Sequence, residues 1–388
     1  MMYKNLIIEI ENLNFSYDKK YRLTIDKLAI PERKIVTILG PSGSGKTTLL
    51  NLIAGFLDHK KAIKNKAKSL ENIGYIMQKD NLYNQISVIK NLWISAKNSN
   101  KWRWTTYKKI INSQALEHKS KEKIKSLIDH QLENLEKNKK NLFANFKLRY
   151  WLLQSGWLFL KFYKVVYKEF LEQVDELFTI LEIKGIENKK ASDISGGQQQ
   201  RVAFAKAIIK GNNFILMDEP FASLDAKIKE STIKWLEKIK QQFDLSIIFV
   251  THDQVDALKI SDLVILLKDG KVEQYGSPQD LFENPNNTFV AKFIGFPEIN
   301  FIGEDNEKQA YIRSKYLKIE DFAGNAELLF KKNIGDGFWV KILDKEKNIE
   351  LELVINNDLK SKYLNVVYQD EKILYFDRQG QRIHNGLK

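Results

Sequence analysis

A glycine-rich loop carries the clearest chemistry in this sequence. The pattern G-x-x-x-x-G-K-[ST] is matched between a short apolar run, 35–39, and a helical segment, which is the context that the pattern requires. Its glycines let successive main-chain N–H groups point at one phosphate, and the helix N-terminus adds a favourable dipole. Lys46 adds a cation for the terminal phosphates, and the Thr47 hydroxyl can hold Mg²⁺. The predicted nucleotide contacts are Gly40, Pro41, Ser42, Gly43, Ser44, Gly45, Lys46, Thr47 and Thr48.

Two adjacent acids follow another apolar run. Asp218 and Glu219 come directly after 214–217, a segment short and apolar enough for a buried parallel strand. In open α/β sheets, ligands bind at the carboxyl ends of the strands. We therefore expect Asp218 to reach Mg²⁺ through water and Glu219 to orient and activate the attacking water. Ordinary acids at the exit of a strand would give the same pattern, so the pair gains meaning only beside other motifs.

A third motif opens another helix. Residues 194–201 read ISGGQQQR and precede an apolar-periodic stretch. They resemble the LSGGQ signature of ABC ATPases, with isoleucine in place of the usual leucine. A serine that caps a helix is the plainer interpretation. In the family, this helix N-terminus is a second anion site that faces the γ-phosphate held by the partner subunit, so hydrolysis is a property of a dimer. The residues to which the resemblance gives this role are Ser195, Gly196, Gly197 and Gln198.

Further motifs of the same family appear in chain order. Singly, each would more often be a core aromatic, a surface amide or a structural histidine. The resemblance implies that Tyr17 stacks on adenine and that His252 contacts the γ-phosphate. It implies that Gln78 touches Mg²⁺ and the water and couples to a permease, and that Asp225 is the D-loop aspartate. The implied cofactors are ATP and Mg²⁺. The implied catalytic residues are Glu219, His252 and Gln78, and the implied metal ligands are Thr47, Gln78 and Asp218.

The apolar runs predict the fold class. Short runs at 73–77, 247–250 and 263–267 are bounded by turn or charged residues and predict further buried parallel strands, whereas Asp269-Gly270 predicts a hairpin turn. We expect an α/β P-loop ABC ATPase domain over 1–296, with a helical subdomain over about 85–205. Past 297, alternating stretches such as 338–343 and 349–354 predict short antiparallel strands. Residues 297–388 are expected to form a small β-barrel of the OB or TOBE type.

The segment 98–164, called the insertion below, departs from the family's pattern. It is proline-free and rich in Lys, Glu, Leu and Asn, so we expect helices. Between 97 and 170, 17 Lys and Arg stand against 6 Asp and Glu, so this part carries +11 of the chain's net charge of +13. Its aromatic residues, such as Trp102 and Tyr150, have three interpretations. They form a small core of the insertion, which we favour, or they contact anionic lipid or a permease, or they stack on nucleic acid.

Several classes of protein are excluded by composition. The chain has no cysteine, which excludes disulfides and thiolate metal sites. Its most apolar stretch, 150–163, contains Lys161 and is shorter than the roughly 20 residues of a membrane span, and no signal peptide is recognised at the start. The resemblance to ABC ATPases implies a peripheral protein on the cytoplasmic face of the cell membrane. The partners that it implies are a second ATPase subunit (in a homodimer or a heterodimer), integral membrane permease subunits and, indirectly, an external solute-binding protein, whereas nucleic acid is not expected.

A rival function is that of a soluble ABC ATPase acting on the ribosome or on nucleic acid. That class predicts two cassettes in one chain or a long coiled coil, but the sequence has one cassette and the insertion lacks sustained heptads.

The end of the ATPase segment resembles a narrower group. Residues 289–301 read FVAKFIGFPEINF, close to the FVAxFIGxPxMNF of sugar and glycerol-phosphate importer ATPases. Tyr311-Ile312-Arg313 resembles the start of their regulatory domain, and 373–377 with Gly380 resembles its last strand. The resemblance implies import of a sugar or of glycerol phosphate. ATPases of polyamine (spermidine/putrescine) importers share this architecture and stay open as the alternative.

Two departures from the family bear on structure. The interval between Lys46 and Gln78 is short, which predicts that the usual hairpin is shortened and that 60–68 form a loop. Ala222 stands where the D-loop normally has serine, which weakens one contact across the dimer.

Overall fold

The structure is a computed structural model that falls into two compact units. The first consists of residues 1–252, 260–262 and 269–271, and the second of 253–259, 263–268 and 272–388. The structure describes residues 5–17, 22–58, 62–66, 72–77, 81–113, 118–136, 144–154, 159–222, 226–305, 308–322 and 324–383. The expected domain boundary between 296 and 297 stays a prediction.

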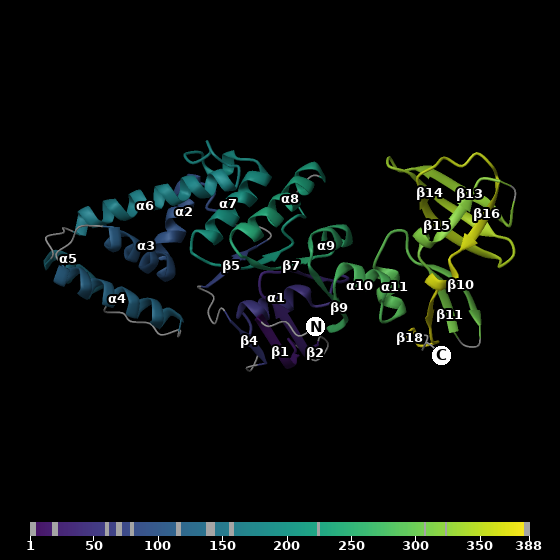
Figure 1. Cartoon of the computed structure of the whole chain (residues 1–388), viewed down its shortest axis with the longest axis horizontal. Coiled ribbons are helices and arrows are strands. Elements are labelled where there is room, and N and C mark those ends of the chain that lie inside the picture. The colour runs from purple at the N-terminus through teal and green to yellow at the C-terminus, as the bar shows by residue number, and fades with distance from the viewer. Residues whose placement is uncertain are drawn as a thin grey trace. The chain divides into compact units, whose positions relative to one another are not determined.

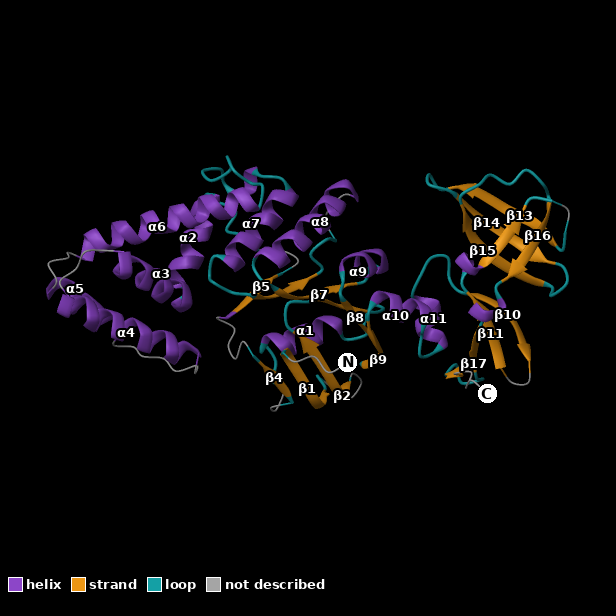
Figure 2. Cartoon of the chain, viewed as in Figure 1, coloured by secondary structure: helices purple, strands orange, loops and turns teal. Residues whose placement is uncertain are grey.

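Parallel strands form the centre of the first unit (Figure 2). They lie in the order β5-β6-β7-β3, and nearly every residue in them is buried, which is typical of a sheet covered on both faces. The prediction of buried parallel strands is therefore confirmed for this unit. Their bounds are β3 (Ile35–Leu39), β5 (Ile73–Ile76), β6 (Phe214–Asp218) and β7 (Ser246–Thr251).

A small antiparallel sheet lies beside α1 (Lys46–Ala54), which packs against β6 and β7 as well as against β4 (Figure 1). The sheet has the order β2-β1-β4, with β1 (Leu6–Phe15), β2 (Leu23–Pro31) and β4 (Ile63–Asn65). The loop expected over 60–68 is therefore wrong for 63–65. Ile63 is buried opposite Ile10, and Lys64 lies 3.2 Å and 3.3 Å from the carboxylates of Glu9 and Glu11. Three residues are too few for alternation to reveal a strand in the sequence.

Helices make up the rest of the first unit. The prediction of a helical insertion is confirmed for the described residues, and no described helix is both long enough and apolar enough to cross a membrane. The helices are α2 (Val88–Asn98), α3 (Asn100–Ser113), α4 (His118–Glu136), α5 (Ala144–Gln154), α6 (Phe159–Ile180), α7 (Gly196–Ile208) and α8 (Ala226–Gln242), with a 3-10 turn at Ala191–Asp193.

Aromatic side chains of the insertion pack inward. Trp102 and Trp104 are both buried, and the Trp102 ring meets Trp93 and Phe170 edge-on at 5.9 Å and 6.1 Å between ring centroids. The interpretation that these aromatics form a core is thus confirmed for Trp102 and Trp104. Tyr150 is different, because its side chain is exposed.

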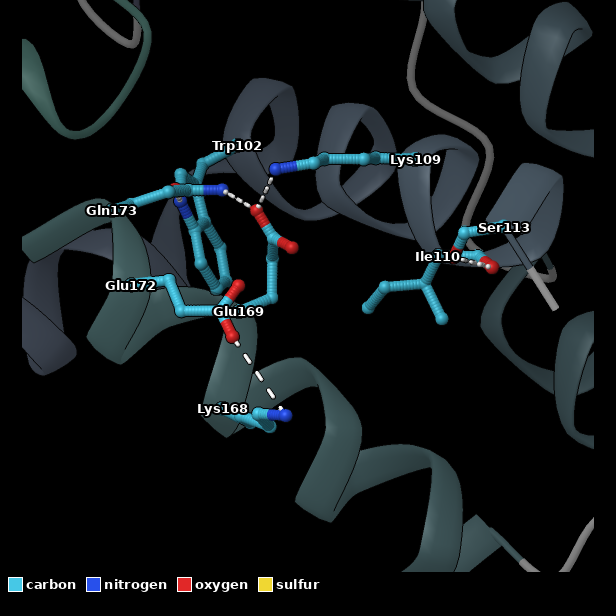
Figure 3. Close-up of polar contacts among 8 residues, drawn as sticks. All are labelled: Trp102, Lys109, Ile110, Ser113, Lys168, Glu169, Glu172 and Gln173. Carbon is cyan, nitrogen blue, oxygen red and sulfur yellow. Dashed lines mark hydrogen bonds and ion pairs between the residues drawn. The ribbon is translucent and has the colours of Figure 1, made fainter. Parts of the chain in front are cut away.

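A chain of polar contacts joins α3 to α6 within this core (Figure 3). The Trp102 indole N–H donates to the Gln173 side-chain oxygen at 2.7 Å. Glu169 is 9% exposed, and its Oε1 accepts from Gln173 Nε2 at 2.9 Å and from Lys109 Nζ at 2.6 Å. The hydrogen bond to Glu169 raises the pKa of Lys109. A buried carboxylate whose hydrogen bonds are satisfied in this way helps to fix the packing of α3 on α6.

Short helices and one hairpin come before the β-rich part of the second unit, and the turn of the hairpin, 269–271, is counted with the first unit. The chain turns between β8 and β9 at Asp269 and Gly270, whose φ values of 48° and 74° suit the primed turn that an Asp-Gly pair predicts. The elements are α9 (Gln254–Ile260), β8 (Leu263–Lys268), β9 (Lys271–Gly276), α10 (Pro278–Glu283) and α11 (Thr288–Phe293).

Two antiparallel sheets complete the second unit, in the orders β10-β11-β17-β18 and β12-β16-β13-β14-β15. They share one core, to which β10 gives Ile302 and β14 gives Val340. The Asn300 side chain bridges them by exchanging two hydrogen bonds, of 2.9 Å and 2.7 Å, with the main chain of Glu352. The expected small β-domain is confirmed, although the strand of 373–377 is not the last one, because β18 follows it.

The bounds of these strands are β10 (Asn300–Asp305), β11 (Lys308–Ile312), β12 (Leu317–Glu320), β13 (Ala326–Asn333), β14 (Phe338–Asp344), β15 (Ile349–Ile355), β16 (Tyr363–Tyr368), β17 (Leu374–Phe376) and β18 (Arg382–Ile383), with 3-10 turns at Ser314–Tyr316 and Asp370–Lys372.

One buried arginine joins the short helices of the second unit to the end of β11. Arg313 is 2% exposed. Its Nε and Nη2 donate to the carbonyl of Phe282 at 3.2 Å and 3.1 Å, and its Nη1 donates to the carbonyls of Ala291, at 2.7 Å, and Ile294. The guanidinium also lies 4.2 Å from the centre of the Phe282 ring. Burial lowers the pKa of Arg313 to about 10, so the side chain is charged at neutral pH.

Candidate nucleotide-binding site

The glycine-rich loop connects β3 to α1, as its spacing predicts. Gly43 and Gly45 have φ values of 80° and 100°, in the left-handed region that residues with a Cβ rarely adopt. A Cβ at Gly43 would meet no atom within 4 Å, so the backbone conformation and not crowding requires glycine there. The Ser44 carbonyl accepts from the Gly270 N–H at 3.2 Å, which anchors the loop from outside.

Lys46 lies folded along this loop. Its Nζ donates to the carbonyls of Gly40 and Pro41 at 2.9 Å and 2.8 Å. Burial lowers the pKa of Lys46, and the charges of Glu219 and Asp218 act in the opposite direction. The buried hydroxyl of Ser44 has no hydrogen-bond partner in the described part of the chain. The Lys46 cation lines the pocket and fits a phosphate ligand, whereas Ser44 is not among the residues that line it.

The acid pair stands at the carboxyl end of β6. The Thr47 hydroxyl donates to Asp218 Oδ1 at 3.4 Å, which brings together two oxygen ligands of the kind that Mg²⁺ prefers. Burial, and after it the charge of Glu219, raises the pKa of Asp218. A cation bound beside Asp218 would relieve that cost, so the residues present fit a divalent ion.

Glu219 has a conformation that the sequence does not reveal. Its φ is 45°, in the left-handed region, and its N–H donates to the carbonyl of Val250 at 3.0 Å. Its Oε1 lies 3.0 Å from Nδ1 of His252, which follows β7. Backbone strain of this kind persists where the surroundings fix it, and it is common at functional sites. Glu219 and His252, expected to act together, are therefore in contact.

A pocket of about 410 Å³ opens beside these groups. Its lining residues are Tyr17, Ser42, Gly43, Gly45, Lys46, Thr47, Thr48 and Glu219. The Tyr17 ring is 59% exposed and lies edge-on to Phe15 at 4.9 Å between ring centroids. The structure thus brings Tyr17, the phosphate loop and Glu219 to one cavity, with Asp218 beside Thr47 and His252 beside Glu219. Gln78 and Asp225 lie outside the described residues.

The signature segment forms the capped start of α7. The Ser195 hydroxyl accepts from the Gln198 N–H at 3.3 Å, and the Gln198 side chain accepts from the Ser195 N–H at 3.1 Å, so the two form a capping box. Ser195 and Gly196 are exposed, whereas Gly197 is buried beside Ile228. None of these residues lines the nucleotide pocket of their own chain. The structure therefore does not bring them together with the Lys46 loop.

One contact near the site escaped prediction. The Tyr75 hydroxyl, on β5, donates to the Asn51 side chain of α1 at 3.0 Å. Burial, together with the charge of Asp218, raises the pKa of Tyr75 to about 12. The only signal in the sequence is that Tyr75 stands on the strand leading to Gln78.

Taken together, the fold and the pocket define a P-loop ATPase of the α/β class. The family model described as "ABC transporter" matches residues 23–222. The chain belongs to this family.

Similar proteins indicate which kind of ABC transporter ATPase this chain resembles. The spermidine/putrescine import ATP-binding protein PotA of Mycoplasmopsis synoviae is 32% identical over 89% of this chain and 89% of its own length. The sulfate/thiosulfate import ATP-binding protein CysA of Halalkalibacterium halodurans is 30% identical over 74% of this chain and 66% of its own length. A solved structure of cbiO1 from Clostridium perfringens, part of the ABC transporter complex cbiONQ, covers 72% of this chain with a TM-score of 0.51 and 21% identity, and it supports the fold.

The protein is an ATP-binding, ATP-hydrolysing subunit of an ABC transporter of the import type. The expectation of sugar or glycerol phosphate as the solute is not confirmed, because the names of these relatives indicate polyamines or sulfate.

Proposed function

We propose that this chain energises the import of a polyamine. Three of the relatives with the highest similarity carry the name spermidine/putrescine import ATP-binding protein, and one of them matches this chain over 89% of both lengths. This supports the alternative that the junction over 289–301 left open. The solute itself meets other subunits, so the proposal concerns the complex in which this chain works.

The residues of the pocket have the following proposed roles. Lys46 and the loop N–H groups bind the terminal phosphates of ATP, and Tyr17 stacks on the adenine. Glu219, oriented by His252, accepts a proton from the attacking water as the bond to the γ-phosphate breaks. The observation that carries these roles is the convergence of Tyr17, Lys46, Thr47 and Glu219 on one cavity.

Mg²⁺ is proposed to bind at Thr47 and Asp218, with Gln78 as a further ligand. The ion would neutralise charge on the phosphates. What the protein contributes is a pair of oxygen ligands and a carboxylate whose pKa is raised by burial, so that ionising Asp218 is favoured when a cation is present.

The second half of each site is proposed to come from another ATPase subunit. Ser195 and Gly196 are exposed at the start of α7, away from the pocket lining of their own chain. Main-chain N–H groups at a helix N-terminus favour an anion, so Ser195, Gly196, Gly197 and Gln198 of one subunit would close over the γ-phosphate bound by the other. Asp225 would lie at the same interface.

The remaining partners follow from the same proposal. The subunit works at the cytoplasmic face of the membrane beneath integral permease subunits, and an external solute-binding protein delivers the polyamine. ATP binding closes the two ATPase subunits, and hydrolysis resets them.

A direct experiment measures the ATPase rate of the complex of this chain with its permease and binding protein. The complex is purified from the membranes in which it is produced and is placed in lipid nanodiscs. Spermidine or putrescine should raise the rate severalfold, whereas sulfate and maltose should not. A complex with Lys46→Ala should stay at the background rate with every solute, because the phosphate cation is lost. Stimulation by sulfate or maltose and not by polyamines would refute the proposed solute, and full activity of Lys46→Ala would refute the proposed site.

A further inference from the structure

α5, in the insertion, has one face inside the core. Its buried residues Ala144, Leu148 and Leu152 are spaced i, i+4 and i+8 and belong to the continuous core of the first unit. This is the face expected of any helix that packs on its neighbours. The opposite face of α5 is also apolar.

The second face consists of Phe146, Tyr150 and Leu153, called the outer stripe here. These residues are spaced i, i+4 and i+7, and they are 68%, 59% and 58% exposed. At about 100° per residue, the centre of the outer stripe lies roughly 165° around the helix from the centre of the buried face. More than half of each of these three side chains is therefore open to solvent, on the side of the helix away from the core. Three large apolar side chains exposed together on one face mark an interaction surface more often than a single exposed one does.

Basic residues flank the outer stripe on both sides. Lys147 and Arg149 are exposed, and helical geometry places them roughly 90° and 65° from the centre of the stripe, in opposite directions. They belong to the part of the chain that carries +11 of the net charge of +13. An apolar stripe between basic flanks is the pattern of a helix that lies in the interface of a membrane with anionic lipids.

The alternatives fit this surface less well. A single-stranded nucleic acid stacks its bases on aromatic rings along a basic groove, but Leu153 offers no ring and the stripe is the convex side of one helix. A stable protein interface buries about 800 Å² on each partner. Aromatic side chains bury roughly 150–250 Å² each, so three side chains fall short of that area. A lipid surface has no such minimum, because one short helix can lie in it.

We propose that α5 docks on the anionic lipid surface of the membrane in which the transporter sits. Phe146, Tyr150 and Leu153 enter the boundary between headgroups and acyl chains, while Lys147 and Arg149 contact headgroup phosphates. The helix packs against α4 and α6, and α6 is joined in turn to α3 by the contacts of Trp102, Gln173, Glu169 and Lys109 (Figure 3). The inference rests on the proposed function only in placing the chain at a membrane.

The experiment measures binding of the purified full chain to sedimenting vesicles of phosphatidylcholine with 30% phosphatidylglycerol, and to vesicles of phosphatidylcholine alone. Wild type should bind the anionic vesicles and release them when salt is raised, because exposed charges are screened. The variant Lys147→Gln/Arg149→Gln should bind about 30-fold more weakly, since each base near an anionic surface contributes roughly a factor of five. The variant Phe146→Ser/Tyr150→Ser/Leu153→Ser should bind the anionic vesicles at least about tenfold more weakly, because its helix buries less apolar surface in the lipid.

A matched control removes three exposed apolar residues of the second unit, Phe322→Ser/Leu329→Ser/Tyr363→Ser, and should bind like wild type. ATP binding by every variant, measured separately, establishes that each is folded and tests the nucleotide site independently of lipid. Equal binding of wild type and the outer-stripe variant would overturn the proposal. The proposal would also be overturned if the wild-type chain did not bind the anionic vesicles. It would be overturned as well if the same variants lost binding to single-stranded RNA and kept their binding to vesicles.

Discussion

Arg313 gives the sharpest prediction of stability from this structure. Its guanidinium makes four hydrogen bonds to three main-chain carbonyls, those of Phe282, Ala291 and Ile294. Arg313→Met keeps the length of the aliphatic stem but removes every donor. A buried carbonyl left without its partner costs about 1–3 kcal/mol, so three of them cost roughly 3–9 kcal/mol. Part of this is recovered because a charge is no longer buried, which leaves a loss of about 3 kcal/mol.

Arg313→Lys is the matched control. A lysine ammonium can reach the carbonyls of Ala291 and Ile294, where Nη1 now donates, but it cannot reproduce the fork on Phe282. Its cost should therefore be smaller, about 1–2 kcal/mol. The order of stability should be wild type, then the lysine variant, then the methionine variant.

The free energy of unfolding of each protein is measured by urea unfolding, which is monitored by tryptophan fluorescence. Trp339 is the one tryptophan in the sequence of the second unit, so the difference between a protein and its Trp339→Phe counterpart reports on that unit. With a slope of about 2 kcal/mol per M, the methionine variant should unfold at a urea concentration about 1.5 M lower. A midpoint unchanged in Arg313→Met, with the slope also unchanged, would refute the reasoning that the arginine satisfies these carbonyls.

Two further predictions concern the first unit. Burial, and after it the charge of Glu219, raises the pKa of Asp218, so ionised Asp218 destabilises the folded state. This destabilisation is complete at a pH above the raised pKa and absent below about pH 3.8. Asp218→Asn should therefore melt a few degrees higher than wild type at pH 7 without nucleotide, lose that gain toward pH 4, and bind ATP no more tightly with Mg²⁺ than without it. A lower melting temperature at pH 7 would contradict this. Trp102→Phe should cost about 1–2 kcal/mol, because it leaves the Gln173 oxygen without its donor; faster amide exchange in α3 would reveal it, and unchanged exchange would count against it.

The parts of the fold that the sequence predicts are those with strong local signals. The β3 strand and the start of α1 at Lys46 lie where the phosphate-loop pattern places them, because that pattern describes one continuous strand, loop and helix. The Asp269-Gly270 turn is equally local. β4 was missed, since its three residues owe their conformation to β1, which lies about 50 positions earlier in the chain.

The features of the candidate site are likewise of two kinds, those that local sequence predicts and those that tertiary packing sets. Lys46 and Thr47 follow from spacing alone, whereas the contact between Glu219 and His252 depends on the pairing of β6 with β7, which no short window of sequence contains. The left-handed backbone at Glu219 and the hydrogen bond from Tyr75 to Asn51 are set by tertiary packing. Arg313 stood in a recognised motif, yet its role comes from the carbonyl ends of α10 and α11.

The proposed dimer, in which two ATPase subunits share each nucleotide, can be tested directly. Glu219→Gln should bind ATP but not hydrolyse it, so with Mg²⁺ and ATP the purified chain of 45.3 kDa should sediment at twice its mass, and it should return to the single mass with ADP. Adding Ser195→Arg to the same chain should abolish the doubling, because the arginine would fill the place of the γ-phosphate. Glu219→Gln that binds ATP fully and still sediments as a single chain would contradict the account.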